Sequence, residues 1–147
     1  MNSDPSTQRF EIQLVVEPAD IDELGHVNNV VYVAWVQQAA IAHWNRATTP
    51  EEKSEALWVV TRHEIDYRYP ARLGDRILVR TWVGTSTGRT FDRHTEIRRV
   101  EGNVLLARAR TVWVPIDPAT GRPRMVSEGL RKRFSVPASE VKLEPLE

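Results

Sequence analysis

A short polar segment near the start of the sequence carries the side chains with the strongest chemistry. It contains a carboxylate, an imidazole and two carboxamides at Asp22, His26, Asn28 and Asn29. Carboxylates and imidazoles act as bases or nucleophiles, and carboxamides donate hydrogen bonds. The residues that follow, up to Trp44, are almost all apolar, so the segment is predicted to be a loop that leads into a helix. The free amides at a helix N-terminus can stabilise negative charge that develops in a reaction.

Ordinary structural roles explain several of these residues one at a time. Asp20 or Asp22 can be an ordinary loop or capping residue. Gly25 can supply a positive φ in a turn, and Asn28 can be the N-cap of the helix. These roles do not explain why His26, a second asparagine and Tyr32 accompany the acid. We therefore interpret the segment as a functional site.

A long helix is predicted from Asn29 to Arg46. Its apolar residues fall on nearly every face instead of on one stripe, which indicates a helix wrapped by the rest of the domain. At about 1.5 Å per residue the helix is roughly 27 Å long. A curved sheet of four to six strands can enclose a rod of that length.

Alternating apolar and polar residues predict five strands around this helix. Short turns join most of them, which requires antiparallel pairing and gives an α+β fold. The last strand carries small residues, including Ala107 and Ala109, which would allow the helix to approach closely. The predicted strands are residues 10–16, 58–69, 76–83, 90–100 and 104–116.

Composition limits the possible functions further. The 147 residues are 41% hydrophobic and suit one domain, for which we expect loosely ordered tails at 1–8 and 138–147. Without cysteine there is no thiol nucleophile, disulfide or thiolate metal site. The four histidines are scattered, so we expect no metal. Zero net charge gives no reason to expect nucleic acid, and no segment is apolar enough for a membrane, so a cytoplasmic protein is expected.

The polar segment resembles the signature of hotdog-fold acyl thioesterases of the 4-hydroxybenzoyl-CoA thioesterase type. That signature, Asp-x-Asp-x-x-Gly-His-Val-Asn-Asn-x-x-Tyr, occurs at residues 20–32. The likeness continues through residues 67–75, 111–117 and 120–123, so it covers most of the chain. The first motif is specific, whereas each later one is weak alone. The resemblance implies a hotdog fold, in which an antiparallel sheet wraps a long central helix.

The resemblance also implies a reaction, the hydrolysis of an acyl thioester. Asp22 would act as a general base on water or as a nucleophile, and the backbone amide of Asn29 would polarise the thioester carbonyl. His26 and Asn28 would orient the acyl group, water or Asp22. Some related enzymes use a glutamate further along the helix, where this chain has Gln37 and Gln38. Asp22 would then be the one catalytic carboxylate.

Substrate and assembly follow from the same resemblance. Gly25, Tyr32 and His63 are the expected substrate-binding residues, although a core histidine with satisfied hydrogen bonds would also explain His63. The substrate would be an acyl-CoA or an acyl carrier protein conjugate, with no cofactor. A homodimer or homotetramer is expected, because an open sheet leaves edges to be covered.

The sequence leaves alternatives open for the catalytic acid, for the function and for the phosphate contacts. Asp20 is a second candidate acid, although a structural role is favoured for it. The chain could also be a hotdog hydratase or dehydratase, or a non-catalytic module that binds acyl thioesters. Arginines near turns and strand ends could contact the phosphates of coenzyme A, but a solvated strand face explains each of them as well: Arg89, Arg93, Arg98, Arg99 and Arg124.

Overall fold

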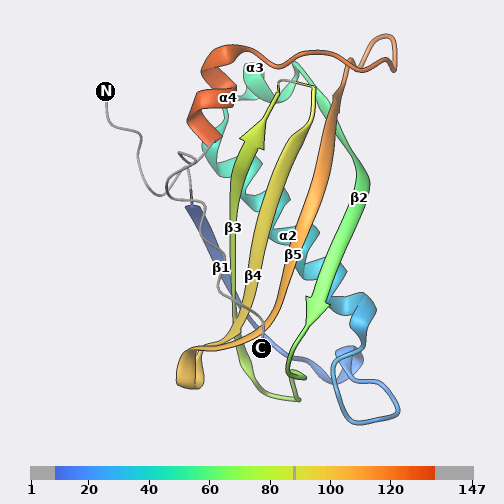
Figure 1. Ribbon diagram of the computed structural model, residues 1–147, viewed down its shortest axis with the longest axis vertical. Helices are drawn as coiled ribbons and strands as arrows, with labels where there is room; N and C mark the ends of the chain where they lie inside the picture. Colours follow the sequence, from blue (N-terminus) through green and yellow to red (C-terminus); the bar gives the residue numbers. More distant parts are fainter. Residues whose placement is uncertain (1–8, 88, 135–147) are drawn as a thin grey trace.

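A twisted sheet of five antiparallel strands packs against one long helix in this computed structural model (Figure 1). The structure describes residues 9–87 and 89–134, so the expected tails at 1–8 and 138–147 lie outside the described residues. Along the sheet the strand order is β1-β3-β4-β5-β2, which leaves β1 and β2 at the edges. The strands are β1 (Arg9–Val15), β2 (Leu57–Tyr67), β3 (Arg76–Ser86), β4 (Phe91–Arg99) and β5 (Val104–Ile116).

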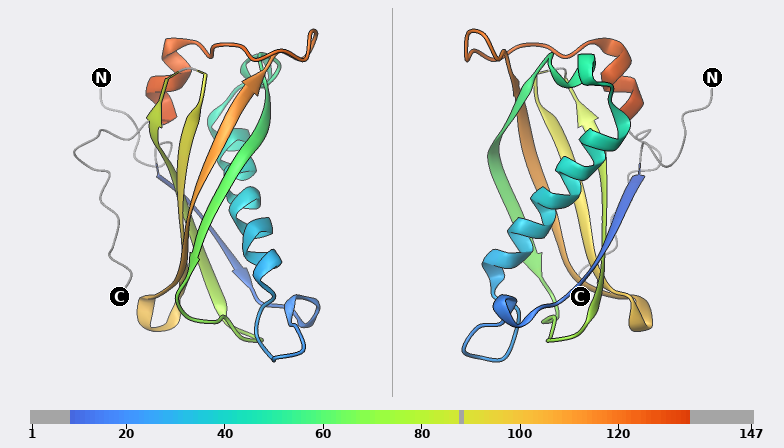
Figure 2. Two further views of the ribbon diagram at one scale, coloured as in Figure 1. Left: turned by 45° about the vertical axis from the view of Figure 1, so that its right-hand side comes forward. Right: turned by 180° about the vertical axis from the view of Figure 1, so that it is seen from behind.

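The long helix α2 (Asn29–Ala47) crosses one face of the sheet (Figure 2). It begins after the loop that follows β1 and the short 3-10 turn η1 (Pro18–Asp20). Two short helices, α3 (Pro50–Lys53) and α4 (Glu128–Phe134), lie near the opposite end of α2, and a second 3-10 turn, η2 (Glu101–Asn103), joins β4 to β5. The loop before α2 and the helix α4 therefore mark the two ends of the molecule's long axis.

The main core lies between α2 and the sheet. Val36 and Ala39 of α2 are fully buried against strand residues such as Ile97. On β5 the small side chains of Ala107 and Ala109 face this core, as predicted, and let the helix come close. Burying such apolar side chains stabilises the fold by about 25 cal/mol for each Å² removed from water.

The far side of α2 differs from its prediction. We expected the helix to be covered on nearly all sides, but the sheet covers one side, and Val30 and Ile41 are 72% and 53% exposed. Ala34 and Gln38 lie on the same open side. A single sheet can contact only one side of a rod, so the remaining apolar residues of α2 stay uncovered in this chain.

The predicted elements otherwise agree closely with the observed ones. All five strands and the long helix are present, and their ends differ from the predicted ones by at most three residues. No helix within the described ranges is both long and apolar enough to cross a membrane.

Candidate active site

Hydrogen bonds fix the shape of the loop that precedes α2. Ile21 and Val27 pair as an isolated antiparallel bridge, and the Asp22 amide donates to the His26 carbonyl at 2.8 Å. The Val27 amide donates to the carbonyl of Ala71 at 3.0 Å, which ties the loop to the segment after β2. Gly25 turns the chain with a φ of +78°, a conformation that side chains disfavour. Together these contacts present the polar residues of the loop in one arrangement.

The Asp22 carboxylate is held within this loop. Its Oδ1 accepts hydrogen bonds from the amides of Leu24 at 2.9 Å and His26 at 3.4 Å. The side chain is partly buried, and Oδ2 is the oxygen left for other contacts. Asp20 has a different role, because its carboxylate accepts from the Glu17 amide at 2.9 Å and closes the η1 turn. This contact supports the structural role favoured for Asp20.

The start of α2 leaves one backbone donor free. Asn28 caps the helix, since its side-chain oxygen accepts from the Val30 amide at 3.0 Å. The Tyr67 hydroxyl donates to the Asn29 carbonyl at 3.0 Å. The Asn29 amide has no acceptor among the described residues. A free N–H at a helix N-terminus is suited to bind a negatively charged oxygen.

An open depression of about 400 Å³ joins the loop, the start of α2 and the end of β2. We call it the Asp22 depression. Five of the predicted site residues line it: Asp22, His26, Asn28, Asn29 and Tyr32. Six further residues complete its wall: Leu24, Val27, Tyr67, Arg68, Tyr69 and Pro70. None of these six was predicted from the sequence as a site residue, although Tyr67 and Tyr69 lie at the end of a predicted strand in which polar and apolar residues clearly alternate.

Two tyrosines of the depression are neutral at physiological pH. Burial raises the pKa of Tyr32, and burial also raises the pKa of Tyr67. The Tyr32 hydroxyl accepts from the Ala71 amide at 2.9 Å, and the residue as a whole is 2% exposed, so it forms part of the floor. These hydroxyls can therefore donate or accept hydrogen bonds but cannot act as bases.

Arg68 is the one cation on the wall of the depression. Its guanidinium lies 5.4 Å from the centre of the Tyr69 ring. The buried Nε has no hydrogen-bond acceptor within residues 9–87 and 89–134. This arginine is thus available to an anionic group that enters the depression.

Two predicted binding residues do not line the depression. Gly25 contributes through the shape of the loop. His63 lies in the middle of β2, where its Nδ1 is 3.1 Å from the Thr111 hydroxyl and burial lowers its pKa. His63 therefore has the hydrogen-bonded setting that was the alternative explanation for it.

Arg93 overturns the expectation of a solvated strand face. Its side chain points to the inner side of β4, and the residue is only 7% exposed. In an antiparallel strand alternate residues face opposite sides, so Arg93 shares the inner side with Phe91 and Thr95. Phe91 and Arg93 line one pocket with residues of α2, and Arg93 is hydrogen-bonded to His43 of that helix, so this side of β4 faces α2.

Comparison with known proteins gives the chain a family. Residues 16–134 match the thioesterase-like superfamily. YbgC, an acyl-CoA thioester hydrolase of Escherichia coli O157:H7, is 26% identical over 132 residues, which are 88% of this chain and 98% of that protein. A palmitoyl-acyl carrier protein thioesterase of Gossypium hirsutum is 34% identical over 106 residues, or 65% of this chain. The chain spans only about a quarter of the length of that plant protein.

Solved structures show the same fold. A thioesterase from Thermus thermophilus, complexed with coenzyme A and Zn, is 27% identical with a TM-score of 0.74, covering 84% of this chain and 90% of that one. A 1,4-dihydroxy-2-naphthoyl-CoA thioesterase from Synechocystis is 21% identical with a TM-score of 0.73, covering 90% and 97%. The expected α+β hotdog fold is confirmed, and a thioester hydrolase is the enzyme class of the matched family. The chain belongs to the thioesterase-like superfamily.

Proposed function

We propose that this protein hydrolyses acyl-CoA thioesters in the Asp22 depression. One observation carries the proposal: a fixed carboxylate and a free helix N-terminal amide line the same depression. Hydrolysis of a thioester needs a group that activates or delivers a nucleophile. It also needs a hydrogen-bond donor for the carbonyl oxygen, which becomes negatively charged. The Asp22 carboxylate can meet the first need and the Asn29 amide the second.

The reaction can follow either of two routes from this arrangement. As a general base, Asp22 takes a proton from water while the water oxygen attacks the carbonyl carbon. As a nucleophile, Asp22 attacks that carbon itself and forms a mixed anhydride, which water then hydrolyses. In both routes the Asn29 N–H donates to the carbonyl oxygen, the carbon–sulfur bond breaks, and the thiolate leaves and gains a proton. A donor of this kind contributes about 3 kcal/mol to transition-state stabilisation.

Other residues of the depression would position the reactants. His26 and Asn28 offer an imidazole and a carboxamide beside Asp22, suited to orienting the water or the acyl group. Gln37 and Gln38 lie further along α2 in a separate surface groove, so neither brings a second acid or amide to the depression. This separation supports a mechanism with one catalytic carboxylate.

An acyl-CoA is favoured over an acyl carrier protein conjugate. The match to the acyl-CoA thioester hydrolase YbgC spans nearly all of that protein, whereas the match to the acyl carrier protein thioesterase spans a quarter. Arg68 would bind an anionic part of the substrate, since its guanidinium is free for a phosphate or carboxylate. The acyl group would then lie toward the tyrosines of the wall.

We further propose a homodimer, or a homotetramer built from two such dimers. β2 is an edge strand whose outer residues Leu57 and Val59 are 57% and 47% exposed. Tyr67, at the end of the same edge, is 43% exposed and lines the depression. A second copy paired along β2 would cover this edge and border the depression. Light scattering of the purified protein tests the assembly.

The experiment that tests the activity is thiol release from a panel of short, long and aromatic acyl-CoAs. The protein has no cysteine, so it adds no thiol of its own. Asp22→Asn is the test variant and Asp20→Asn is the matched control, because both exchange a loop carboxylate for its amide. We expect turnover in the wild type and in the control.

Two outcomes without thiol release would contradict the proposed hydrolysis and favour another function. Saturable acyl-CoA binding without thiol release in the wild type would favour the binding module instead. A change in the absorbance of crotonyl-CoA without thiol release would favour a hydratase.

A further inference from the structure

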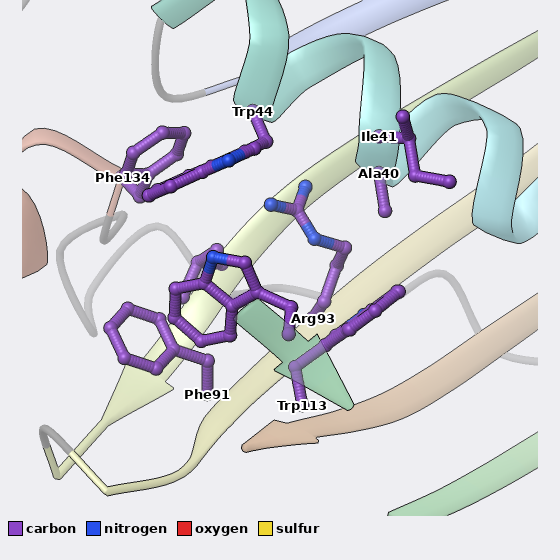
Figure 3. A pocket seen from close by; sticks show the side chains of 9 residues that line it. Ala40, Ile41, Trp44, Phe91, Arg93, Trp113 and Phe134 are labelled. Carbon is purple, nitrogen blue, oxygen red and sulfur yellow. The ribbon is translucent and has the colours of Figure 1, made fainter. Parts of the chain in front are cut away.

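A second pocket lies near the other end of α2, between the helix, the sheet and α4 (Figure 3). Five aromatic side chains surround its volume of about 70 Å³: Trp44, Trp58, Phe91, Trp113 and Phe134. We call it the aromatic cavity. Ile41 on its wall is 53% exposed, so the cavity reaches the surface beside the helix.

The guanidinium of Arg93 points into this cavity, toward the space between Trp44 and Ala40 (Figure 3). Its Nη1 donates to the His43 Nδ1 at 2.9 Å and to the Thr81 hydroxyl at 3.1 Å. Burial lowers the pKa of Arg93 to about 10, so the side chain is still charged at neutral pH. Both hydrogen bonds use the same nitrogen, Nη1.

The positive charge of Arg93 has no carboxylate partner within the described ranges. A buried charge is strongly unfavourable unless an opposite charge or enough hydrogen bonds compensate it. Nη2 and Nε also have no acceptor in that part of the chain. The site thus offers a positive charge and hydrogen-bond donors that suit an anion.

The rest of the cavity wall also has hydrogen-bond donors and no side-chain acceptors. Every polar side-chain group on the wall is a donor, namely the guanidinium and three indole N–H groups. The indole nitrogens of Trp58 and Trp113 are buried without an acceptor among the residues described. The other lining side chains are hydrocarbon, which suits an apolar group attached to the anion.

We propose that the aromatic cavity binds a small carboxylate that carries a short apolar chain. A cavity needs about 10–15 Å³ for each water, so this one has room for about five waters or a ligand with a similar number of heavy atoms. Butyrate has about that size, and its carboxylate can accept from two guanidinium nitrogens at once. From Asn29 to Ala40 is roughly 17 Å along the helix at about 1.5 Å per residue, so the site is separate from the Asp22 depression.

Tryptophan fluorescence gives a direct test, because three of the five tryptophans line the cavity. Sodium butyrate is titrated into the 147-residue protein at constant ionic strength, and butyramide serves as the neutral probe of equal size. We expect saturable quenching by butyrate and binding at least about tenfold weaker for butyramide, because a charged hydrogen bond is lost. Absence of saturable butyrate binding, or equal binding of butyramide, would overturn the proposal.

Two variants locate the binding site. Arg93→Met removes the charge at similar length, and Ala40→Leu fills the cavity while leaving the hydrogen bonds of Arg93 in place. Each is expected to weaken butyrate binding at least about tenfold, whereas Asp22→Asn should leave it unchanged. Circular dichroism verifies that the variants are folded, and Ala40→Leu decides the case if Arg93→Met does not fold. Wild-type affinity in Ala40→Leu would place butyrate elsewhere and contradict the proposal.

Discussion

The two ends of α2 hold pockets of opposite character. At its N-terminal end the Asp22 depression is open and polar, and its carboxylate stands beside a free backbone donor. Near its C-terminal end the aromatic cavity is small and apolar, with one buried guanidinium. The first pocket can stabilise charge that changes during a reaction, whereas the second can neutralise a charge that stays fixed. With the roles proposed for the two pockets, one helix would serve two different kinds of chemistry.

The pockets also differ in how the chain builds them. Seven of the eleven residues that line the depression lie within the loop and the first turn of α2, so local sequence shapes much of it. The aromatic cavity draws on α2, β2, β3, β4, β5 and α4 and exists only after the sheet has formed. Variants near Asn29 should therefore change thioester turnover and leave butyrate binding unchanged. Variants near Arg93 should change butyrate binding and leave turnover unchanged.

Apart from loss of the Asp22 carboxylate itself, the largest expected effect comes from removing the free amide at the start of α2. Asn29→Pro deletes that N–H while keeping the helix, because proline is favoured at the first helical position. Asn28 has φ −60° and ψ 136°, which a following proline tolerates. We expect kcat to fall about 100- to 1000-fold, with butyrate binding unchanged. Thiol release and fluorescence titration measure the two quantities.

Asn29→Ala is the matched control for this substitution. It removes the same side chain but keeps the backbone N–H, so most of the turnover should remain. Equal losses in both variants would mean that the side chain matters and the amide does not.

A smaller effect is expected on stability at the floor of the depression. Tyr32→Phe leaves the fully buried Ala71 amide without its acceptor, which costs about 1–3 kcal/mol in the free energy of unfolding. Tyr67→Phe removes a hydrogen bond from a residue that is 43% exposed, so its loss should be below about 0.5 kcal/mol. Urea unfolding of both variants measures the difference. Similar losses would show that Tyr32 is not a structural part of the floor.

The smallest effect concerns His63, which lies on β2 between the two pockets. Burial lowers the pKa of this imidazole below its ordinary value of 6.5 in the folded chain. The unfolded chain therefore takes up the proton first as the pH falls below about 6.5, and the folded state loses stability until the pH reaches the lowered pKa. His63→Gln should flatten this part of the curve. Unfolding measured from pH 7.5 to 5 checks the slope, and an unchanged slope in the variant would contradict the assignment.

The sequence predicted the fold well because its signals are local. Alternation along residues 58–69 and 104–116 marked β2 and β5, and the apolar run after Asn29 marked α2. The approach of residues 67–70 to the loop could not be read from the sequence, since it depends on how the end of β2 meets the start of α2. The sequence predicted Arg93 on a solvated strand face or near a phosphate, because a lone arginine in a strand gives no sign that five aromatic rings will enclose it.

The most direct test of the account compares thiol release from acyl-CoA by Asp22→Asn and Arg93→Met, with circular dichroism as the test of folding. Asp22→Asn keeps an oxygen that can accept from the Leu24 amide, so the loop should stay intact while turnover falls about 100- to 10,000-fold. Arg93→Met should retain turnover close to that of the wild type. Wild-type thiol release by a folded Asp22→Asn variant would contradict the central claim that thioester hydrolysis takes place in the Asp22 depression.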